Sequence, residues 1–403
     1  ALALDPEFAS AWALFGINLL QDLGQPDSAW AALDEAARRP HRLTSAERLR
    51  LEAFMAGQRW HLRAAMQASD QLVRERPNDT RAWNGRGTTL FRLRGPEAVL
   101  ETLDHIRTFE PFETHIRAYN RMVGLIAVGR RVEARQVAPA LRNQRERLTL
   151  SLAAAALDAA WGEVDSLARE LRQEDPRAAT FWRAVLLYVR GEVREADSVL
   201  AGLDARPWLL HSLAAGRPIQ RPARPDTTWE GAVTAALAGD TAAARAELPR
   251  LTADTLDYRV ESGFWRAALE AAIAWRAGDW QSVVQRTGPI LRERPSVGDI
   301  GSAVLWIVGD AYERLGRLDS ATVLLNELVQ PGRRLGFPNT QSYGAAHSYL
   351  RQHLIVLLAR QGRADEARRH WEIFRATFTN PDPELVPLVE EARRALEIAE
   401  RRH

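Results

Sequence analysis

The sequence predicts an all-α fold of about ten antiparallel helix pairs, and three observations indicate it. The stretches from Pro6 to Pro40 and from Pro77 to Pro111 each span 34 residues, and each has Trp six residues, Gly ten residues and Gly eighteen residues after its first proline. On both sides of the second glycine, apolar residues recur every three or four positions, which is the spacing of a helix, a turn and a helix. Ala, Leu and Arg dominate the composition, and β-branched residues are scarce, which favours helices on intrinsic propensity.

A glycine hinge followed five residues later by a small residue marks the predicted pairs, because two helices that cross closely exclude larger side chains. The predicted hinges are Gly24, Gly57, Gly95, Gly129, Gly162, Gly191, Gly239, Gly278, Gly316 and Gly362. Alanine stands five residues after six of them, at Ala29, Ala134, Ala196, Ala244, Ala321 and Ala367. The other four have Leu62, Leu100, Leu167 and Val283, where we expect looser crossings or crossings shifted by a residue.

In chain order, the helix pairs are predicted at 8–38, 43–76, 80–109, 112–141, 144–174, 177–204, 229–251, 258–293, 297–329 and 341–378. Thr44 with Glu47 forms a capping-box pattern at the start of the second pair. In the ninth pair, GDAYERLGRLDSA places Gly309, Tyr312 and Gly316 at small, aromatic and hinge positions. The helix after Pro383 is rich in charge, as expected of a terminal cap.

The periodicity stops between Pro207 and Thr228, where three prolines of GRPIQRPARPDTT are incompatible with a helix interior. The sequence therefore predicts an N-terminal array at 1–206, a Pro/Arg-rich loop or junction at 207–228, a C-terminal array at 229–380 and a capping helix at 381–403. A second long link is predicted at 331–340.

A fixed period in the 30s with this Trp, Gly and Pro punctuation resembles the tetratricopeptide repeat (TPR). The resemblance implies a TPR-like α-solenoid, a right-handed superhelical array whose first helices line a concave groove. It also implies a non-catalytic scaffold that binds a protein or peptide in that groove.

Seven residues are candidates for binding in the groove. If Trp83 packs inward, then Arg81, Asn84, Thr88 and Arg92 face the groove; if Ile116, Tyr119, Val123 and Ile126 pack inward, then Arg117 and Arg121 face it as well. Arginine and asparagine hydrogen-bond carboxylates, so the cluster is similar to the carboxylate clamp of some TPR proteins and predicts an acidic segment or C-terminus as partner. If Leu305 packs inward, Trp306 is a further contact residue, and Asp310 and Glu313 make the other end of the groove acidic.

Other classes of function find little support in the residues. The 54 basic and 52 acidic residues give a net charge of +2, which is too balanced for nucleic-acid binding. No uncharged stretch approaches the length of a membrane span, so no membrane insertion by this segment is expected. The chain has no cysteine, and His347 and His353 are six residues apart, unlike a helical zinc pair. We therefore expect no catalytic, metal or cofactor site and a cytoplasmic location, with an extracytoplasmic domain of a membrane-anchored protein as the alternative.

Two alternatives stay open. The block RLTSAERLRLEAFMAG and the following RERPNDTRAW resemble the helical repeats that follow the catalytic or DNA-binding domain of large bacterial signalling proteins, such as serine/threonine kinases and transcriptional activators. That resemblance implies a regulatory or sensor arm, and the start at Ala1, within a repeat, reads as a fragment of a longer polypeptide. A ligand-sensing module would need a closed apolar pocket with convergent polar groups, for which 207–228 is the only obvious lid.

Overall fold

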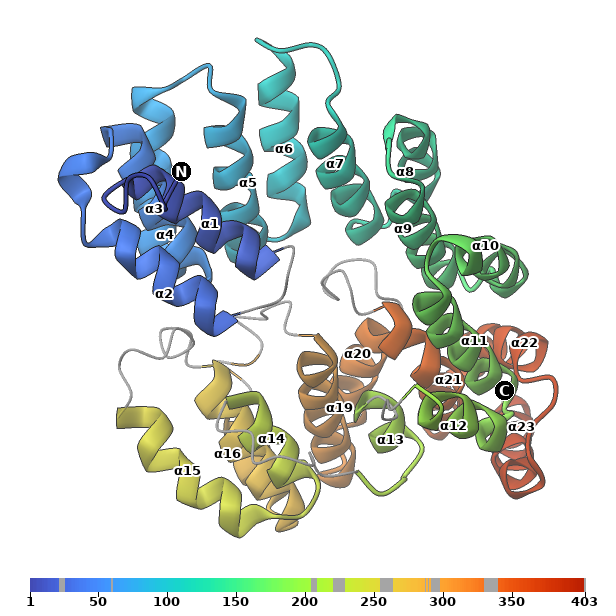
Figure 1. Ribbon diagram of the computed structural model, residues 1–403. Helices are drawn as coiled ribbons and strands as arrows, with labels where there is room; N and C mark the ends of the chain where they lie inside the picture. The colour runs from blue at the N-terminus through green and yellow to red at the C-terminus, as the bar shows by residue number, and fades with distance from the viewer. Residues whose placement is uncertain are drawn as a thin grey trace. The chain divides into compact units, whose positions relative to one another are not determined.

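The computed structural model describes residues 1–21, 26–58, 61–203, 209–219, 229–253, 264–286, 288, 290, 298–329 and 340–401 (Figure 1). These residues form helices and turns, and no strand occurs among them, so the predicted all-α class is confirmed. Contacts between residues divide the chain into two compact units: the N-terminal unit holds the described residues up to Glu113, and the C-terminal unit holds those from Thr114 onward. The predicted domain boundaries, which place a junction at 207–228, stay a prediction.

The N-terminal unit is a stack of three helix pairs. Its helices are α1 (Ala9–Gln21), α2 (Pro26–Ala37), η1 (Pro40–Arg42), α3 (Ser45–Gln58), α4 (Leu62–Glu75), α5 (Thr80–Arg94) and α6 (Pro96–Arg107). Each first helix packs against its own second helix, and α4 packs in turn against α5. The first three predicted pairs are therefore confirmed.

The C-terminal unit contains the remaining pairs. Its helices are α7 (His115–Ala127), α8 (Arg131–Val137), η2 (Ala138–Ala140), α9 (Gln144–Leu157), α10 (Trp161–Glu174), α11 (Pro176–Arg190), α12 (Val193–Ala201), α13 (Leu209–Ala214), α14 (Trp229–Leu237), α15 (Thr241–Ala253), α16 (Phe264–Arg276), α17 (Trp280–Gln285), α19 (Gly298–Arg314), α20 (Leu318–Val329), α21 (Thr340–Arg360), α22 (Ala364–Thr377), η4 (Pro383–Leu385) and α23 (Val386–Glu400). Within 207–228, where a loop was predicted, α13 is helical and mostly buried, so the prediction is wrong there. Residues 220–228 and most of the predicted link at 331–340 lie outside the described residues.

The Trp and Gly positions of the repeat have the same role in both copies. The indole N–H of Trp12 donates to the carbonyl of Pro6 at 2.7 Å, and that of Trp83 donates to the carbonyl of Pro77 at 2.8 Å. A Cβ on Gly16 would lie 2.7 Å from Leu33 Cγ, and one on Gly87 would lie 3.2 Å from Thr102 Cγ2. In both copies, therefore, the Trp six residues after the first proline bonds back to that proline, and the Gly ten residues after it lies where the two helices cross closely.

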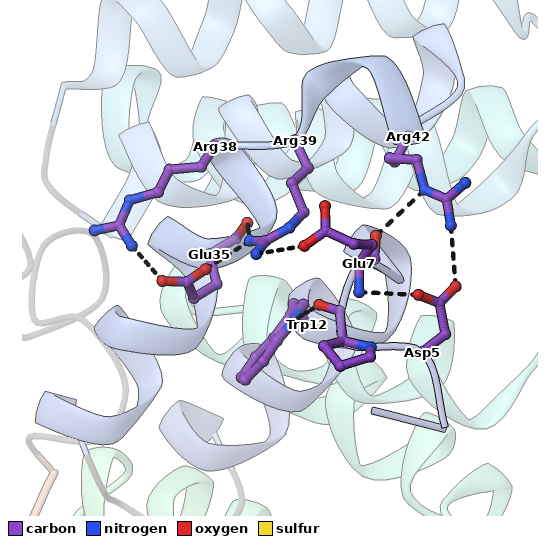
Figure 2. Close-up of polar contacts among 8 residues, drawn as sticks. Asp5, Glu7, Trp12, Glu35, Arg38, Arg39 and Arg42 are labelled. Atoms are coloured by element: carbon purple, nitrogen blue, oxygen red, sulfur yellow. Dashed lines mark hydrogen bonds and ion pairs between the residues drawn. The ribbon is translucent and has the colours of Figure 1, made fainter. Parts of the chain in front are cut away.

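A charged network fastens the first pair to the segment that precedes it. Figure 2 shows Arg39, which follows α2, between the carboxylates of Glu7 at 3.0 Å and Glu35 at 2.5 Å. Hydrogen bonds from Arg39 lower the pKa of both glutamates. Arg42 bonds Asp5 at 3.0 Å, so the chain ahead of α1 is tied to the end of the same hairpin.

Most predicted hinges and all six predicted alanines are confirmed. Seven hinge glycines have φ between 72° and 98°, which only glycine adopts freely, at Gly95, Gly129, Gly191, Gly239, Gly278, Gly316 and Gly362. The six alanines that follow hinges are fully buried. Two hinges are wrong, because Gly57 lies inside α3 and Gly162 inside α10, and Gly24 lies outside the described residues. Ala159, with φ of 54°, makes the turn expected at Gly162.

The last predicted pair departs from the contacts of a simple repeat array, in which each repeat touches only its neighbours. Helix α21 packs against α20 and α22, and also against α9, α11 and α13 (Figure 1). A Cβ on Gly344 would lie 2.5 Å from Val185 Cγ1, and the Ser348 hydroxyl donates to the carbonyl of Val189 at 2.9 Å. Beyond α22, the Asn380 N–H donates to the carbonyl of Arg190 at 3.0 Å. The end of the chain therefore returns onto the middle of the C-terminal unit.

Candidate binding surfaces

Helix α5 presents a polar row on its outward face. The Asp79 carboxylate caps the helix by accepting from the N–H groups of Arg81 and Ala82 at 2.9 and 3.2 Å, which fixes where the first turn starts. Arg81 and Thr88 are exposed and Asn84 is half-buried, whereas Ala82 on the opposite face is 1% exposed. Positions three, four and seven residues apart share a helix face, so these side chains form one row. Arg92 continues the spacing, but its side chain lies outside the described part.

Two features of this row are unexplained by packing inside the protein. Gly85 lies in the row, and a Cβ built on it would find no atom within 4 Å. A glycine in a helix interior costs roughly 0.5–1 kcal/mol relative to alanine. The side-chain oxygen of Asn84 is buried and has no hydrogen-bond partner among the described residues. The surface beside Gly85 is therefore open to close approach, with an unused acceptor next to it.

The packing register predicted for α7 is wrong. Ile116, expected to pack inward, is 60% exposed, whereas Arg117, expected in the groove, is 1% exposed. The buried stripe runs through Ala118, Met122 and Leu125, one position from the predicted one, although Ile126 is buried as predicted. Arg121 is half-buried. Both arginines belong to the C-terminal unit, whereas the α5 row belongs to the N-terminal unit.

Helix α19 uses its predicted groove residues for internal contacts. Trp306 is half-buried, packs on the surrounding core, and meets the Trp275 ring edge-on at 6.0 Å between centroids. Asp310, predicted in the groove, is 7% exposed; it accepts from the Trp275 indole at 2.7 Å and pairs with Arg314 at 3.3 Å. Glu313 accepts from His353 at 2.7 Å and also bonds Arg360, and the His353 contact lowers the pKa of Glu313.

A pocket of about 900 Å³ lies in the C-terminal unit, and we call it the α22 pocket. Its walls come from the α7–α8 turn, the α9–α10 turn, the end of α20, one residue of α21 and one face of α22, with lining residues Val128, Arg131, Leu157, Asp158, Ala159, Val329, Arg351, Arg369, His370, Glu372, Ile373, Ala376 and Thr377. Sequence reasoning missed it, because these residues span more than two hundred positions and meet only through the return of α21 onto α9 and α11.

Solved structures similar to this chain are TPR-repeat proteins. The Cut9–Hcn1 hetero-tetramer of APC/C matches 95% of this chain and 76% of its own at 15% identity and a TM-score of 0.44. The TPR domain of P58(IPK) matches 88% of this chain and 99% of its own at 14% identity and a TM-score of 0.24. A monomeric IFIT1 mutant with a capped RNA matches 97% of this chain and 80% of its own at 14% identity and a TM-score of 0.30. Neither family models nor curated protein sequences match the chain.

The described helix pairs, in each of which the two helices pack against each other, place the chain in one class of fold, the all-α helical-repeat proteins. Among the described helices, none combines the length and the apolar character needed to cross a membrane.

Proposed function

We propose that this chain is a non-catalytic scaffold that binds a peptide or protein through the α5 row, with an acidic segment or C-terminus as the bound element. The observation that carries the proposal is Gly85, an exposed helix-interior glycine with open space beside it. A helix gains stability from alanine at such a position, so the glycine is explained by an outside chain that approaches the backbone.

The side chains around Gly85 supply the polar contacts. The guanidinium of Arg81 makes no hydrogen bond or ion pair with another described residue, so it is available to a carboxylate. Arg86, on another side of α5, is already bound to Asp70 at 2.8 Å and lies over the Trp83 ring. The Asn84 amide supplies a further hydrogen-bonding group once its side chain, whose oxygen is buried and unpartnered in the free chain, turns outward on binding. Arg121 and Trp306, both half-buried in the C-terminal unit, remain proposed contacts of lower rank for that unit alone, and Arg117 is too buried to bind a partner.

Gly85→Ala tests the proposal because it separates binding from stability. We expect the variant to raise the free energy of unfolding by about 0.5–1 kcal/mol, from helix propensity, and yet to weaken binding of a fluorescein-labelled peptide of Glu, Asp and Ala. Fluorescence anisotropy gives the affinity and urea unfolding the stability. Arg81→Ala should weaken the same peptide about 5-fold or more.

Arg107→Ala, an exposed arginine on α6, is the matched control and should leave the affinity unchanged. A C-terminally amidated copy of the peptide shows whether the chain terminus or the acidic side chains are bound. If Gly85→Ala and Arg81→Ala bind the peptide as the parent does, the α5 row is a solvated face and the proposal fails.

A second proposal rests on the bacterial resemblance of RLTSAERLRLEAFMAG: the chain acts as the regulatory or sensor arm of a larger signalling protein. The coding sequence immediately upstream of Ala1 tests it, since a kinase or DNA-binding domain there supports this role and its lack opposes it. We propose a cytoplasmic location, and an export signal or membrane anchor in the same upstream sequence would overturn that.

A further inference from the structure

We propose that the α22 pocket binds a carboxylate carried on a short apolar chain, with Arg351 and Arg369 as its cationic end. This inference concerns the C-terminal unit alone and does not depend on the proposed role of the α5 row.

The pocket as a whole has the size of a ligand site, and part of its wall is apolar. Val128, Leu157, Val329 and Ile373 contribute aliphatic surface to its walls. A volume of about 900 Å³ lies within the usual range for small-molecule sites, which are mostly apolar with a few charged or polar groups.

The cationic part is fixed in place by two histidines. Arg351 is 6% exposed; its Nε donates to His347 Nε2 at 2.9 Å, and its Nη1 lies 2.9 Å from His370 Nδ1. Burial lowers the pKa of His370 to about 4 and holds the pKa of His347 well below its usual range, and the charge of Arg351 adds to both effects. Both imidazoles are therefore neutral near pH 7. They orient the guanidinium while leaving its positive charge unchanged.

The two carboxylates among the lining residues are already paired with arginines. Asp158 is bound by Arg131 and also by Arg135 at 3.2 Å, and Glu372 is bound by Arg375 at 3.2 Å. Arg369 is exposed at the pocket wall, and its guanidinium makes no hydrogen bond or ion pair with any described residue. Planar guanidinium groups bind carboxylates through paired hydrogen bonds, so the chemistry selects a carboxylate.

The test titrates the full chain with octanoate and, in parallel, with octanamide, which keeps the apolar chain and removes the charge. A second pair of ligands, N-acetyl-Ala-Ala-Leu with a free or an amidated C-terminus, distinguishes a peptide end from a free acid. We expect at least one carboxylate to bind by calorimetry, its amide to bind far more weakly, and the ring resonances of His370 to shift on binding. Arg369→Ala should weaken the carboxylate about 5- to 10-fold, and Ile373→Glu should abolish binding by placing a negative charge in the apolar wall.

Arg368→Ala removes a neighbouring arginine that lies outside the pocket and is bound to Glu400, so it is the matched control and should bind as the parent does. Arg351→Gln should abolish binding; if it unfolds, Arg369→Ala and Ile373→Glu still decide. Three results would overturn the proposal: equal binding of a carboxylate and its amide, no binding of either carboxylate, or unchanged carboxylate affinity in both Arg369→Ala and Ile373→Glu.

Discussion

At the scale of single residues, Ala159 occupies a conformation that suits glycine. Its N–H donates to the carbonyl of Ala156 and that of Ala160 donates to Ala155, the same pair of bonds that closes the glycine turns such as the one at Gly129. We expect Ala159→Gly to raise the free energy of unfolding by about 0.5–1 kcal/mol, because alanine is strained at positive φ. Urea unfolding measures it. Ala160→Gly, at a φ of −81°, should not raise the free energy of unfolding. A lower free energy of unfolding in Ala159→Gly would contradict this account.

His211 makes the C-terminal unit sensitive to acid. It is fully buried between the rings of Tyr188 and Tyr349, and neither ring nitrogen has a hydrogen-bond partner among the described residues. Burial, with a further contribution from Arg217, lowers its pKa to about 3. The unfolded chain takes up a proton below about pH 6.5 while the folded chain does not, so stability is complete above that pH and falls toward pH 3. At pH 5 the loss is about 2 kcal/mol.

His211→Phe should remove this part of the acid sensitivity and be close to neutral in stability near pH 7, because a ring of similar shape replaces an unbonded imidazole. Unfolding free energies at about pH 7.5 and pH 5 measure the difference. Some acid loss remains in the variant, since His347 and His370 are also buried. The exposed His41→Phe is the control. If the free energy of unfolding falls between pH 7.5 and pH 5 by the same amount in the parent and in His211→Phe, His211 is not a source of the acid sensitivity.

At the scale of elements, the crossing of α21 over α11 depends on Gly344. An alanine there places its Cβ 2.5 Å from Val185 Cγ1, so Gly344→Ala should lower the free energy of unfolding by about 1–3 kcal/mol through overpacking. Hydrogen exchange should locate the loss in α11 and α21. Gly85→Ala is the opposite case, a helix glycine with free space, and should stabilise. If both variants raise the free energy of unfolding, the crossing of α21 over α11 has room for a Cβ and this account is wrong.

The helix pairs were predictable, whereas the short helix α13 between two pairs and the buried face of α7 were not. Hinge glycines and buried alanines at fixed offsets mark most of the pairs, because close crossings restrict those positions to small residues. The six-residue α13 is too short for a periodic pattern, and nearby prolines hide it. In α7 two apolar stripes overlap, and the one through Met122, rather than the one through Ile116, faces the core. The row on α5 follows from the repeat register once Trp83 is placed.

At the scale of the whole molecule, the pocket could not be predicted, because its walls come from turns and helices that no repeat offset relates. Arg351 and the α9–α10 turn line the same pocket because α21 packs on α9 and α11, and sequence spacing within one repeat contains no signal for that packing. The spacing within each repeat therefore predicted the helix pairs, while the candidate ligand site of the C-terminal unit arises from packing between helices far apart in the sequence.

The return of α21 also has a consequence for the time course of folding during synthesis. Ser348 bonds the carbonyl of a residue 159 positions earlier, so α11 leaves the ribosome long before its partner exists. At roughly 5–20 residues per second, the wait is on the order of ten to thirty seconds. Through that interval the apolar faces of α9 and α11 are uncovered, and pairing across such separations is slow. A nascent chain of this protein therefore offers a hydrophobic surface to chaperones that the finished chain conceals.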